Sequence, residues 1–443
     1  MDAITEGEFS VNEYEIQDTF IEPLYTAIKE MEIRGVNHRE IRAENLFFMD
    51  RDRTEVVVGD CVTSPPGFDQ PLIYEPVPRA MASPGGRGSG DISDDLYALG
   101  VTLIVLILGK KMIDHKSAEA MFTAKIEQGT YSALCGKRKI PVPMIEPLRG
   151  ILSDDLGERW GVDEMNLWVS GKRQPPMQRK PAAKSETPYV FMEKDYRNPI
   201  TLAYAFAKNV KEAAEAIKNQ DLETWLRRSL GDGDSADTVN AVAASAAIQE
   251  NEFRGSDDYI VTKVTILLDP CGPIRYKGLS FIPEGFGSTI AVELLRRNSM
   301  QIAAEVVRNN IPEIWYTTKT DKIRDESSYE YQSVFARMKG ILQINGPGFG
   351  IERCLYEMNS SLSCQSPLIA EQCVVNIEDL LPSLDAIADK VDKKLRPLDR
   401  HVTAFIAGRF KERIEPHLRA LAEPKDSSFL IGMLSLMAYL QWK

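Results

Sequence analysis

Residues that can transfer protons or bind cations are concentrated in one short segment, Gly35–Leu46, with the sequence GVNHREIRAENL. It contains an imidazole, two guanidinium groups, two carboxylates and two side-chain amides, which together offer hydrogen-bond donors, acceptors and charge of both signs. Asp60 follows fifteen residues after Asn45, at the end of the apolar run EVVVGDCV. Neither feature has much meaning alone, so the order and spacing of further motifs must decide the interpretation.

The segment resembles the catalytic loop of protein kinases, whose pattern is H-R-D-L-x-x-x-N. The resemblance implies that Glu40 replaces the Asp that accepts the proton of the substrate hydroxyl. It also implies that His38 and Arg39 organise the loop and that Asn45 binds Mg²⁺. Because Glu is one methylene longer than Asp, and phosphoryl transfer depends mainly on positioning, we expect this replacement to cost much of the rate.

Asp60 lies where kinases carry the D-F-G motif. The resemblance therefore implies that Asp60 binds Mg²⁺ against the nucleotide phosphates. Cys61 and Val62 replace the Phe and Gly of that motif. Since the Gly supplies backbone freedom where kinases switch between states, we expect a fixed activation segment.

Three later segments continue the kinase order. Ala82–Gly85 (ASPG) falls where A-P-E would be and lacks the Glu, so Arg159, the match for the late Arg that pairs with that Glu, needs another partner. Asp94–Val101 (DDLYALGV) resembles the D-x-W-S-L-G-V helix, which implies that Asp95 holds the backbone of the catalytic loop. Leu148–Gly171 resembles the closing helices of the same lobe.

Kinases bind ATP between two lobes, and only about 17 residues precede the first predicted helix, so we expect the N-lobe to be absent from this chain. Two hypotheses follow. The altered motifs favour a catalytically impaired pseudokinase that works as a signalling scaffold or regulator with a protein partner. The alternative is an active serine/threonine kinase with ATP and Mg²⁺ as cofactors, which requires an N-lobe upstream of Met1.

Composition limits the partners. The 443 residues carry a formal net charge of -12, which argues against nucleic acid because phosphate-backbone binding needs clustered Lys and Arg. The six cysteines contain no CxxC pair, and the N-terminus lacks the pattern of a secretory signal, so we expect a cytoplasmic protein. The apolar runs Leu99–Leu108 and Phe429–Leu440 are shorter than the roughly 20 residues that a bilayer requires, which predicts buried helices and no membrane span.

The loop must be positioned by its neighbours. A helical pattern over Asp18–Arg34 stops at Gly35, and two apolar stretches within Leu46–Val62 predict a small hairpin. Residues 63–90 are rich in Pro, Gly and Ser and predict a long loop. Asp94–Lys110 is apolar on most sides, which predicts a central helix.

The chain is expected to be mainly α. We predict a kinase-like C-lobe with a small β-hairpin over residues 1–171, an exposed linker over 172–188, and a helix-rich domain of unknown function over 189–443. Within that domain, Leu202–Leu230 and Leu380–Leu395 show helical spacing, and Tyr259–Leu268 (YIVTKVTILL) predicts a strand.

Other motifs in residues 189–443 point to structure more than to chemistry. The Gly-rich Gly285–Thr289 could bind phosphate at a helix start, but a turn with a helix cap is favoured because the Gly-Lys pair is missing. Gly346–Gly350 is interpreted as a helix break and Trp225 as a core residue. His401 and His417 have no partner carboxylate pattern, so we predict no catalysis there.

Overall fold

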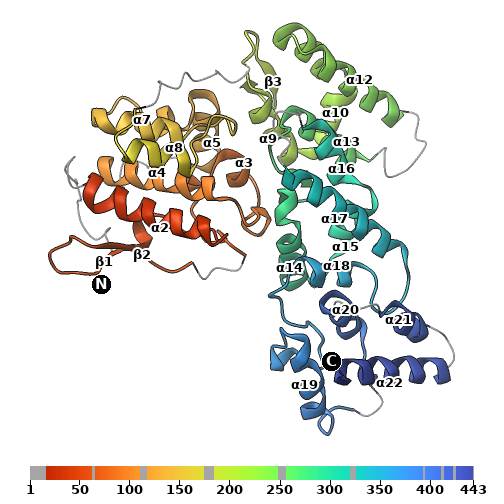
Figure 1. Ribbon diagram of the computed structural model, residues 1–443. Coiled ribbons are helices and arrows are strands. Elements are labelled where there is room, and N and C mark those ends of the chain that lie inside the picture. The colour runs from red at the N-terminus through yellow and green to blue at the C-terminus, as the bar shows by residue number, and fades with distance from the viewer. Residues whose placement is uncertain are drawn as a thin grey trace. The chain divides into compact units, whose positions relative to one another are not determined.

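The computed structural model describes residues 16–61, 65–109, 117–173, 184–247, 256–319, 326–392, 395–410, 414–422 and 426–442. It is 63% helix and 5% strand, and the strands of these residues pair as small antiparallel hairpins, which confirms the predicted fold class. The chain divides into two compact units (Figure 1). The first unit is Met1–Gly285 with Ile314–Asp325, and the second is Phe286–Glu313 with Glu326–Lys443.

The described part of residues 16–173 is helical around one small hairpin. It is called the N-terminal lobe below after its place in the chain, and it is the region whose sequence resembles a kinase C-lobe. Its elements are η1 (Ile16–Ile21), α2 (Glu22–Ile33), η2 (Ala43–Asn45), β1 (Leu46–Phe48), β2 (Val56–Val58), η3 (Leu72–Tyr74), α3 (Val77–Ala80), η4 (Pro84–Gly86), α4 (Ile92–Leu108), α5 (Ala118–Gln128), α6 (Thr130–Cys135), α7 (Val142–Ile151) and α8 (Val162–Val169).

The core of the N-terminal lobe forms around α4. Every residue of this helix from Asp94 to Leu106 is buried, because α2, α6, α7 and α8 all pack against it. Asp91 caps the helix by accepting a hydrogen bond from the backbone N–H of Ser93 at 2.8 Å. Since each large apolar side chain contributes about 1.5–3 kcal/mol when fully buried, this helix dominates the stability of the lobe.

The predicted hairpin is present. β1 and β2 pair antiparallel, with Leu46 opposite Val58. Asp50 orders the turn, because its carboxylate accepts hydrogen bonds from the backbone N–H groups of Thr54 and Glu55 at 2.9 and 3.0 Å. Residues 63–90 are less irregular than predicted, since η3, α3 and η4 lie within them. These short helices follow no hydrophobic period because buried polar contacts position them, as shown below.

Residues 184–285 form a second helical region of the first unit. Its elements are β3 (Tyr189–Phe191), β4 (Lys194–Tyr196), α9 (Pro199–Lys208), α10 (Val210–Lys218), α11 (Asp221–Trp225), η6 (Leu226–Leu230), α12 (Gly233–Ala247), α13 (Asp257–Leu268), β5 (Ile274–Tyr276), β6 (Leu279–Phe281) and η7 (Pro283–Gly285). The helical pattern predicted over Leu202–Leu230 is therefore confirmed but divided among several helices. Part of the predicted linker, residues 174–183, lies outside the described residues.

The strand predicted at Tyr259–Leu268 is wrong, because these residues form α13. Ser256 caps this helix by accepting a hydrogen bond from the backbone N–H of Tyr259 at 3.4 Å. An apolar run rich in β-branched residues is ambiguous by periodicity alone. Here burial on several sides decides: α9, α10 and α12 surround α13, and Ile260 and Val264 are fully buried.

The N-terminal lobe and the second helical region share backbone contacts. The backbone N–H of Ser83 donates to the carbonyl of Ser280, and that of Ile282 donates to the carbonyl of Gly86, both at 2.8 Å. Arg79 adds an ion pair with Glu284 at 3.1 Å. Ser83 and Gly86, at the two ends of η4, are thus hydrogen-bonded to the β5–β6 hairpin and the residue after it.

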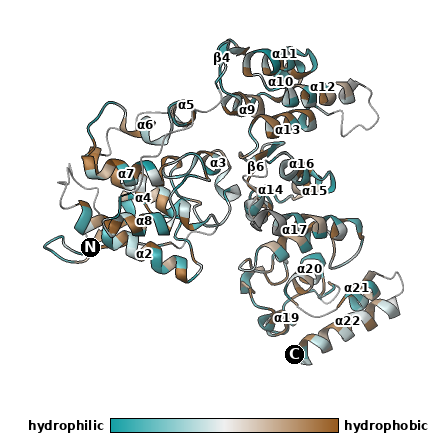
Figure 2. Ribbon diagram, turned by 45° about the horizontal axis from the view of Figure 1, so that its top comes forward, coloured by the Kyte–Doolittle hydropathy of each residue, from teal (hydrophilic) through white to brown (hydrophobic). Residues whose placement is uncertain are grey.

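The second unit is helical. Its main elements are α14 (Phe286–Arg297), α15 (Gln301–Arg308), α17 (Glu326–Gln343), α18 (Ile351–Met358), η8 (Ala370–Gln372), η9 (Ile377–Asp379), α19 (Leu380–Ile387), α20 (Arg400–Arg409), α21 (Glu415–Ala422) and α22 (Asp426–Trp442), and α16 (Ile311–Thr318) spans the division between the units. The helix predicted over Leu380–Leu395 is shorter, because α19 ends at Ile387. α22 is apolar along much of its length (Figure 2). Within the described residues, no helix is both long and apolar enough to span a membrane.

Gly86 is required by the contact between the lobe and β6. A Cβ atom at this position would lie against the carbonyl of Ser280 and 2.8 Å from the Cα of Phe281, both of which are backbone atoms. We expect Gly86→Ala to lower the free energy of unfolding by about 2 kcal/mol or more, measured by urea denaturation. Gly157→Ala is the matched control, because a Cβ there meets only ordinary contacts. Equal effects of the two variants would contradict the backbone pairing.

Candidate functional site

The loop between α2 and β1 is held by the buried side chain of Asp95. Its carboxylate accepts hydrogen bonds from the backbone N–H groups of His38 and Arg39, at 2.6 and 2.8 Å. Arg39 adopts a left-handed backbone conformation with a φ of 63°, which is costly for a residue other than Gly. Burial raises the pKa of Asp95 to about 6, although both N–H bonds favour the ionised form. The loop conformation therefore depends on this one carboxylate.

His38 links the loop to the end of β2. Its Nε2 lies 3.1 Å from the carbonyl oxygen of Gly59, and its Nδ1 accepts a hydrogen bond from the backbone N–H of Glu40 at 3.2 Å. An acceptor Nδ1 with a donor Nε2 defines the neutral tautomer. Burial also lowers the pKa of His38, which agrees with a neutral ring. His38 thus serves the loop as a structural crosslink.

Glu40, which the kinase resemblance would make the catalytic base, is buried with only 2% of its surface exposed. Its carboxylate forms an ion pair with Arg42. The same Arg42 nitrogen donates to the side-chain oxygen of Gln70 at 3.2 Å, and Gln70 donates to the carbonyl of Ile41 at 3.0 Å. The carboxylate therefore faces the interior of the protein. A general base, in contrast, needs to face a substrate hydroxyl.

Asn45 joins the loop to Asp60. Its Nδ2 donates to the carbonyl oxygens of Glu40 and Asp60, both at 2.9 Å. The opposite side of the amide, Oδ1, lies against Gly59, where any side chain would collide with it. The side chain of Asp60 is exposed, as is that of Cys61, whereas Val62 lies outside the described residues.

The oxygen atoms of Asn45 and Asp60 fit magnesium, which prefers carboxylate and amide oxygen ligands. The fit is incomplete. In the described part of the chain, no group of three or more His, Cys, Asp or Glu residues could hold a metal by itself. A nucleotide would have to supply further oxygen ligands, as phosphates do in kinases.

Residues 65–90, where the kinase resemblance would place the activation segment, are fixed to the loop by Arg39. The guanidinium donates through Nη2 to both carboxylate oxygens of Glu75, at 3.0 and 2.9 Å, and both side chains are almost fully buried. Arg87 strengthens the same region by donating to the carbonyls of Gly67 and Gln70 at 2.8 and 2.7 Å. Buried arginine contacts to a carboxylate and to backbone carbonyls therefore hold this segment against the loop.

Asp94 provides the partner that Arg159 was predicted to need. Its carboxylate lies 2.7 Å from Arg79, 3.6 Å from Arg39 and 3.8 Å from Arg159. Burial opposes ionisation of Asp94, but these three arginines outweigh burial and lower the pKa of the carboxyl. Arg159 also donates to the carbonyl of Ser153 at 2.8 Å.

Lys125 of α5 is a buried cation that sequence reasoning missed. Its ammonium donates to the carbonyls of Ile73 and Glu75 at 2.8 and 3.1 Å and to the hydroxyl of Tyr97 at 3.0 Å. Helical spacing could have located this residue, because Lys125 falls three positions after the buried Phe122. The contacts of Glu75 could not have been read from the sequence, since they come from residues far along the chain.

The other motifs have structural explanations in the described residues. Gly285 ends η7 and Phe286–Thr289 form the first turn of α14, so this Gly-rich motif lies within helical structure, whereas the glycines of Gly346–Gly350 lie between α17 and α18. The indole N–H of the buried Trp225 donates to the carbonyl of Thr187 at 2.9 Å. The Nδ1 of His401 lies 2.9 Å from the hydroxyl of Tyr356.

Comparison with known proteins gives a partial likeness. No protein-family model matches the chain. A similar curated protein is the serine/threonine-protein kinase D of Synechocystis sp., which is 28% identical over 107 residues. The match covers 22% of this chain and 21% of that kinase, so the chain spans about a fifth of the relative's length. These findings support a kinase-like relation for part of the chain.

The Glu40 ion pair can be tested by a double-mutant cycle. We expect Glu40→Gln and Arg42→Met each to destabilise the protein by roughly 1–3 kcal/mol, because each removes one side of an ion pair whose carboxylate is buried. The double variant should lose less than the sum, with a coupling energy of about 0.5–3 kcal/mol in urea denaturation. Strictly additive losses would show that the two side chains do not interact in solution.

Lys125 predicts a pH dependence of stability. Burial lowers its pKa to about 7 from the 10.5 of an exposed lysine. Between these values the unfolded chain binds a proton that Lys125 lacks in the folded protein, so the contribution of Lys125 to the free energy of unfolding rises as pH increases from about 7 to 10. The buried cysteines contribute with the opposite sign, because burial raises their pKa values above 9.0. Lys125→Met should remove this slope in urea denaturation at several pH values, while Lys137→Met, at an exposed position, should keep it. An unchanged slope in Lys125→Met would contradict the assignment.

Proposed function

We propose that this chain is a kinase-like protein that does not transfer phosphate and acts as a regulator or scaffold for a protein partner. The observation that carries the proposal is the ion pair between the buried carboxylate of Glu40 and the partly exposed guanidinium of Arg42. A catalytic base must present a lone pair to the hydroxyl that it deprotonates. With its carboxylate paired and only 2% of its surface exposed, Glu40 cannot do this without breaking the pair.

The fixed activation segment supports the same proposal. Kinases order this segment by phosphorylation, which creates new pairs between arginine and phosphate. Here the carboxylate of Glu75 already occupies Arg39. In addition, residues 83–86 are paired with β6. A segment with both constraints is suited to presenting a constant surface to a partner and poorly suited to switching.

A second function, weak kinase activity, is favoured by Asn45 and Asp60. The amide oxygen of Asn45 and the exposed carboxylate of Asp60 remain oxygen ligands of the kind that hold Mg²⁺ against ATP. Magnesium bound there would neutralise charge on the phosphates. Nucleotide binding without transfer is consistent with both the retained ligands and the occupied base.

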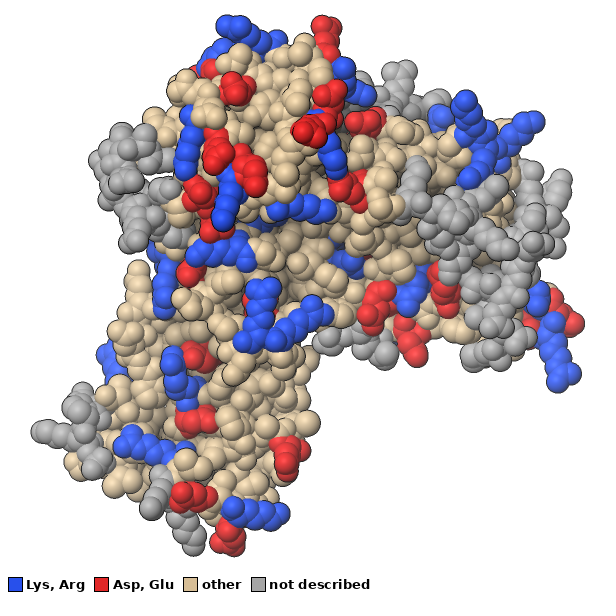
Figure 3. All heavy atoms as spheres, turned by 180° about the vertical axis from the view of Figure 1, so that it is seen from behind, with Lys and Arg blue, Asp and Glu red and all other residues tan. Residues whose placement is uncertain are grey.

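Surface charge gives no sign of a nucleic-acid partner on the face drawn in Figure 3. Among the described residues on that face, Lys and Arg side chains are interspersed with Asp and Glu (Figure 3). Binding to a phosphate backbone needs a continuous basic surface. A protein partner, recognised through a mixed polar surface, fits this face better.

The test is a phosphotransfer assay with Mg²⁺ and ATP, on the chain itself and on a generic basic protein substrate. We expect no incorporated phosphate, by mass spectrometry, in the wild type or in Asp60→Ala. Asp52→Ala is the matched control, since Asp52 is an exposed aspartate in the hairpin turn. Phosphate transfer by the wild type and Asp52→Ala that is lost in Asp60→Ala would overturn the proposal and favour the weak kinase.

A further inference from the structure

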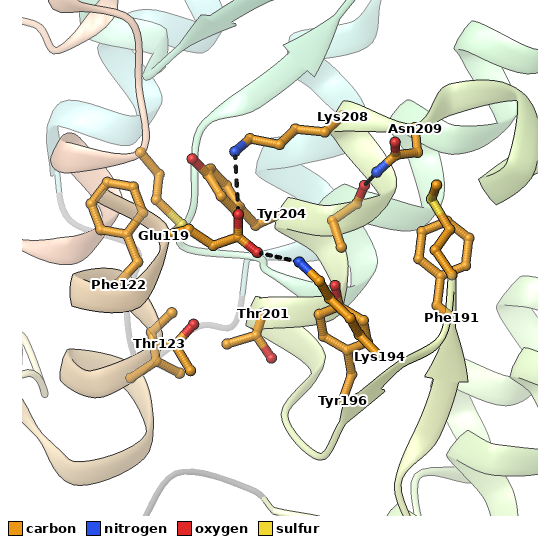
Figure 4. Close-up of a pocket in the computed structure, with 14 residues that line it drawn as sticks. Glu119, Phe122, Thr123, Phe191, Lys194, Tyr196, Thr201, Tyr204, Lys208 and Asn209 are labelled. Atoms are coloured by element: carbon orange, nitrogen blue, oxygen red, sulfur yellow. Dashed lines mark hydrogen bonds and ion pairs between the residues drawn. The ribbon is translucent and has the colours of Figure 1, made fainter. Parts of the chain in front are cut away.

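A cavity of about 210 Å³ lies within the first unit, between α5, the β3–β4 hairpin and α9 (Figure 4). Much of its wall is apolar or aromatic. The aromatic rings are contributed by Phe122, Phe191, Tyr196 and Tyr204. Phe122 and Tyr204 meet edge to face, with ring centroids 5.5 Å apart. Such a wall favours a flat, apolar ligand.

Two lysines stand at this cavity and share one carboxylate. The ammonium of Lys194 lies 3.3 Å from one oxygen of Glu119, and that of Lys208 lies 3.9 Å from the other. Figure 4 shows Glu119 between the two lysines. Each lysine ammonium has three N–H donors, so it can bind more than one acceptor. The two lysines carry two positive charges and Glu119 carries one negative charge, which leaves one net positive charge. The rim is therefore suited to one additional anion.

The turn that carries Met192 to the cavity is strained. Met192 and Glu193 both have positive φ, 49° and 62°, in a two-residue hairpin turn of the kind that favours Asn-Gly. Met192 lines the cavity and remains 52% exposed. The corresponding turn of β5–β6 has glycine at its second position, Gly278. Backbone strain of this kind gathers at ligand sites, where it holds a side chain in a required place.

We propose that this cavity binds a small aromatic carboxylate with a single ring. The ring would pack against Phe122, Tyr204 and the thioether of Met192, which adapts to flat surfaces. The carboxylate would pair with Lys194 and Lys208. The volume lies below the usual 300–1,000 Å³ of drug-sized sites, which limits the ligand to one ring. This inference goes beyond the proposed function and does not depend on it.

Binding at this cavity would join two parts of the first unit. Glu119 and Phe122 belong to α5 of the N-terminal lobe, whereas Lys194 and Lys208 belong to the second helical region. A ligand that contacts both sides adds its binding free energy to their association. The cavity would then let a small metabolite of this class stabilise the paired arrangement of lobe and helical region.

The experiment uses the full chain and isothermal titration calorimetry with 3-phenylpropionate, with 3-phenylpropionamide as the uncharged matched probe. We expect saturable binding of the acid with one site and at least tenfold weaker binding of the amide. Lys194→Gln combined with Lys208→Gln should weaken binding of the acid at least tenfold. Glu119→Gln should strengthen it several-fold, because it frees both ammonium groups.

Lys218→Gln is the control for loss of a lysine charge away from the cavity, since Lys218 is an exposed lysine of α10 that pairs with Asp257 and does not line the cavity. Circular dichroism confirms folding of each variant. The proposal is overturned if the acid does not bind at millimolar concentration, or if the amide binds as tightly as the acid. It is also overturned if Lys218→Gln weakens binding as much as the double lysine variant, or if Glu119→Gln weakens it.

Discussion

Two adjacent aspartates at the start of α4 organise the polar interior of the N-terminal lobe. The carboxylate of Asp95 accepts hydrogen bonds from the backbone N–H groups of His38 and Arg39, which fixes the candidate loop. Asp94 gathers Arg39, Arg79 and Arg159 around one carboxylate. Both carboxylates are buried, which is tolerable only because hydrogen bonds and opposite charges surround them. The apolar body of α4 positions both.

This arrangement contributes more to specificity than to net stability. Removing Arg39 and Glu75 from water costs free energy that their mutual attraction only partly repays. The Nε atoms of Arg39 and Arg87 are buried without a hydrogen-bond partner among the described residues, which adds to the cost. The network holds residues 65–87 against the loop, and the backbone hydrogen bonds of Ser83 and Gly86 hold the same segment against the β5–β6 hairpin.

The sequence was informative where local pattern determines structure. The apolar run of α4 and the two short stretches of the β1–β2 hairpin are predictable because buried helices and strands have apolar residues in a regular pattern along consecutive positions. Tyr259–Leu268 was misassigned because its β-branched residues suit a strand, and only the helices packed around it decide the outcome. The partners of Asp94 and Glu75 come from positions dispersed along the chain, so no local sequence pattern predicts them.

The candidate site shows why retained residues are weak evidence for activity. Asn45 matches a magnesium ligand in the kinase pattern, yet its Nδ2 donates to the carbonyls of Glu40 and Asp60. Losing Asn45 would leave two carbonyls of the loop without a donor, whatever the protein binds. His38 likewise contributes a crosslink to Gly59 as a neutral ring. These residues would therefore be kept for the fold alone. In the proposed function, the residue on which catalysis would depend is Glu40, and its carboxylate forms an ion pair with Arg42.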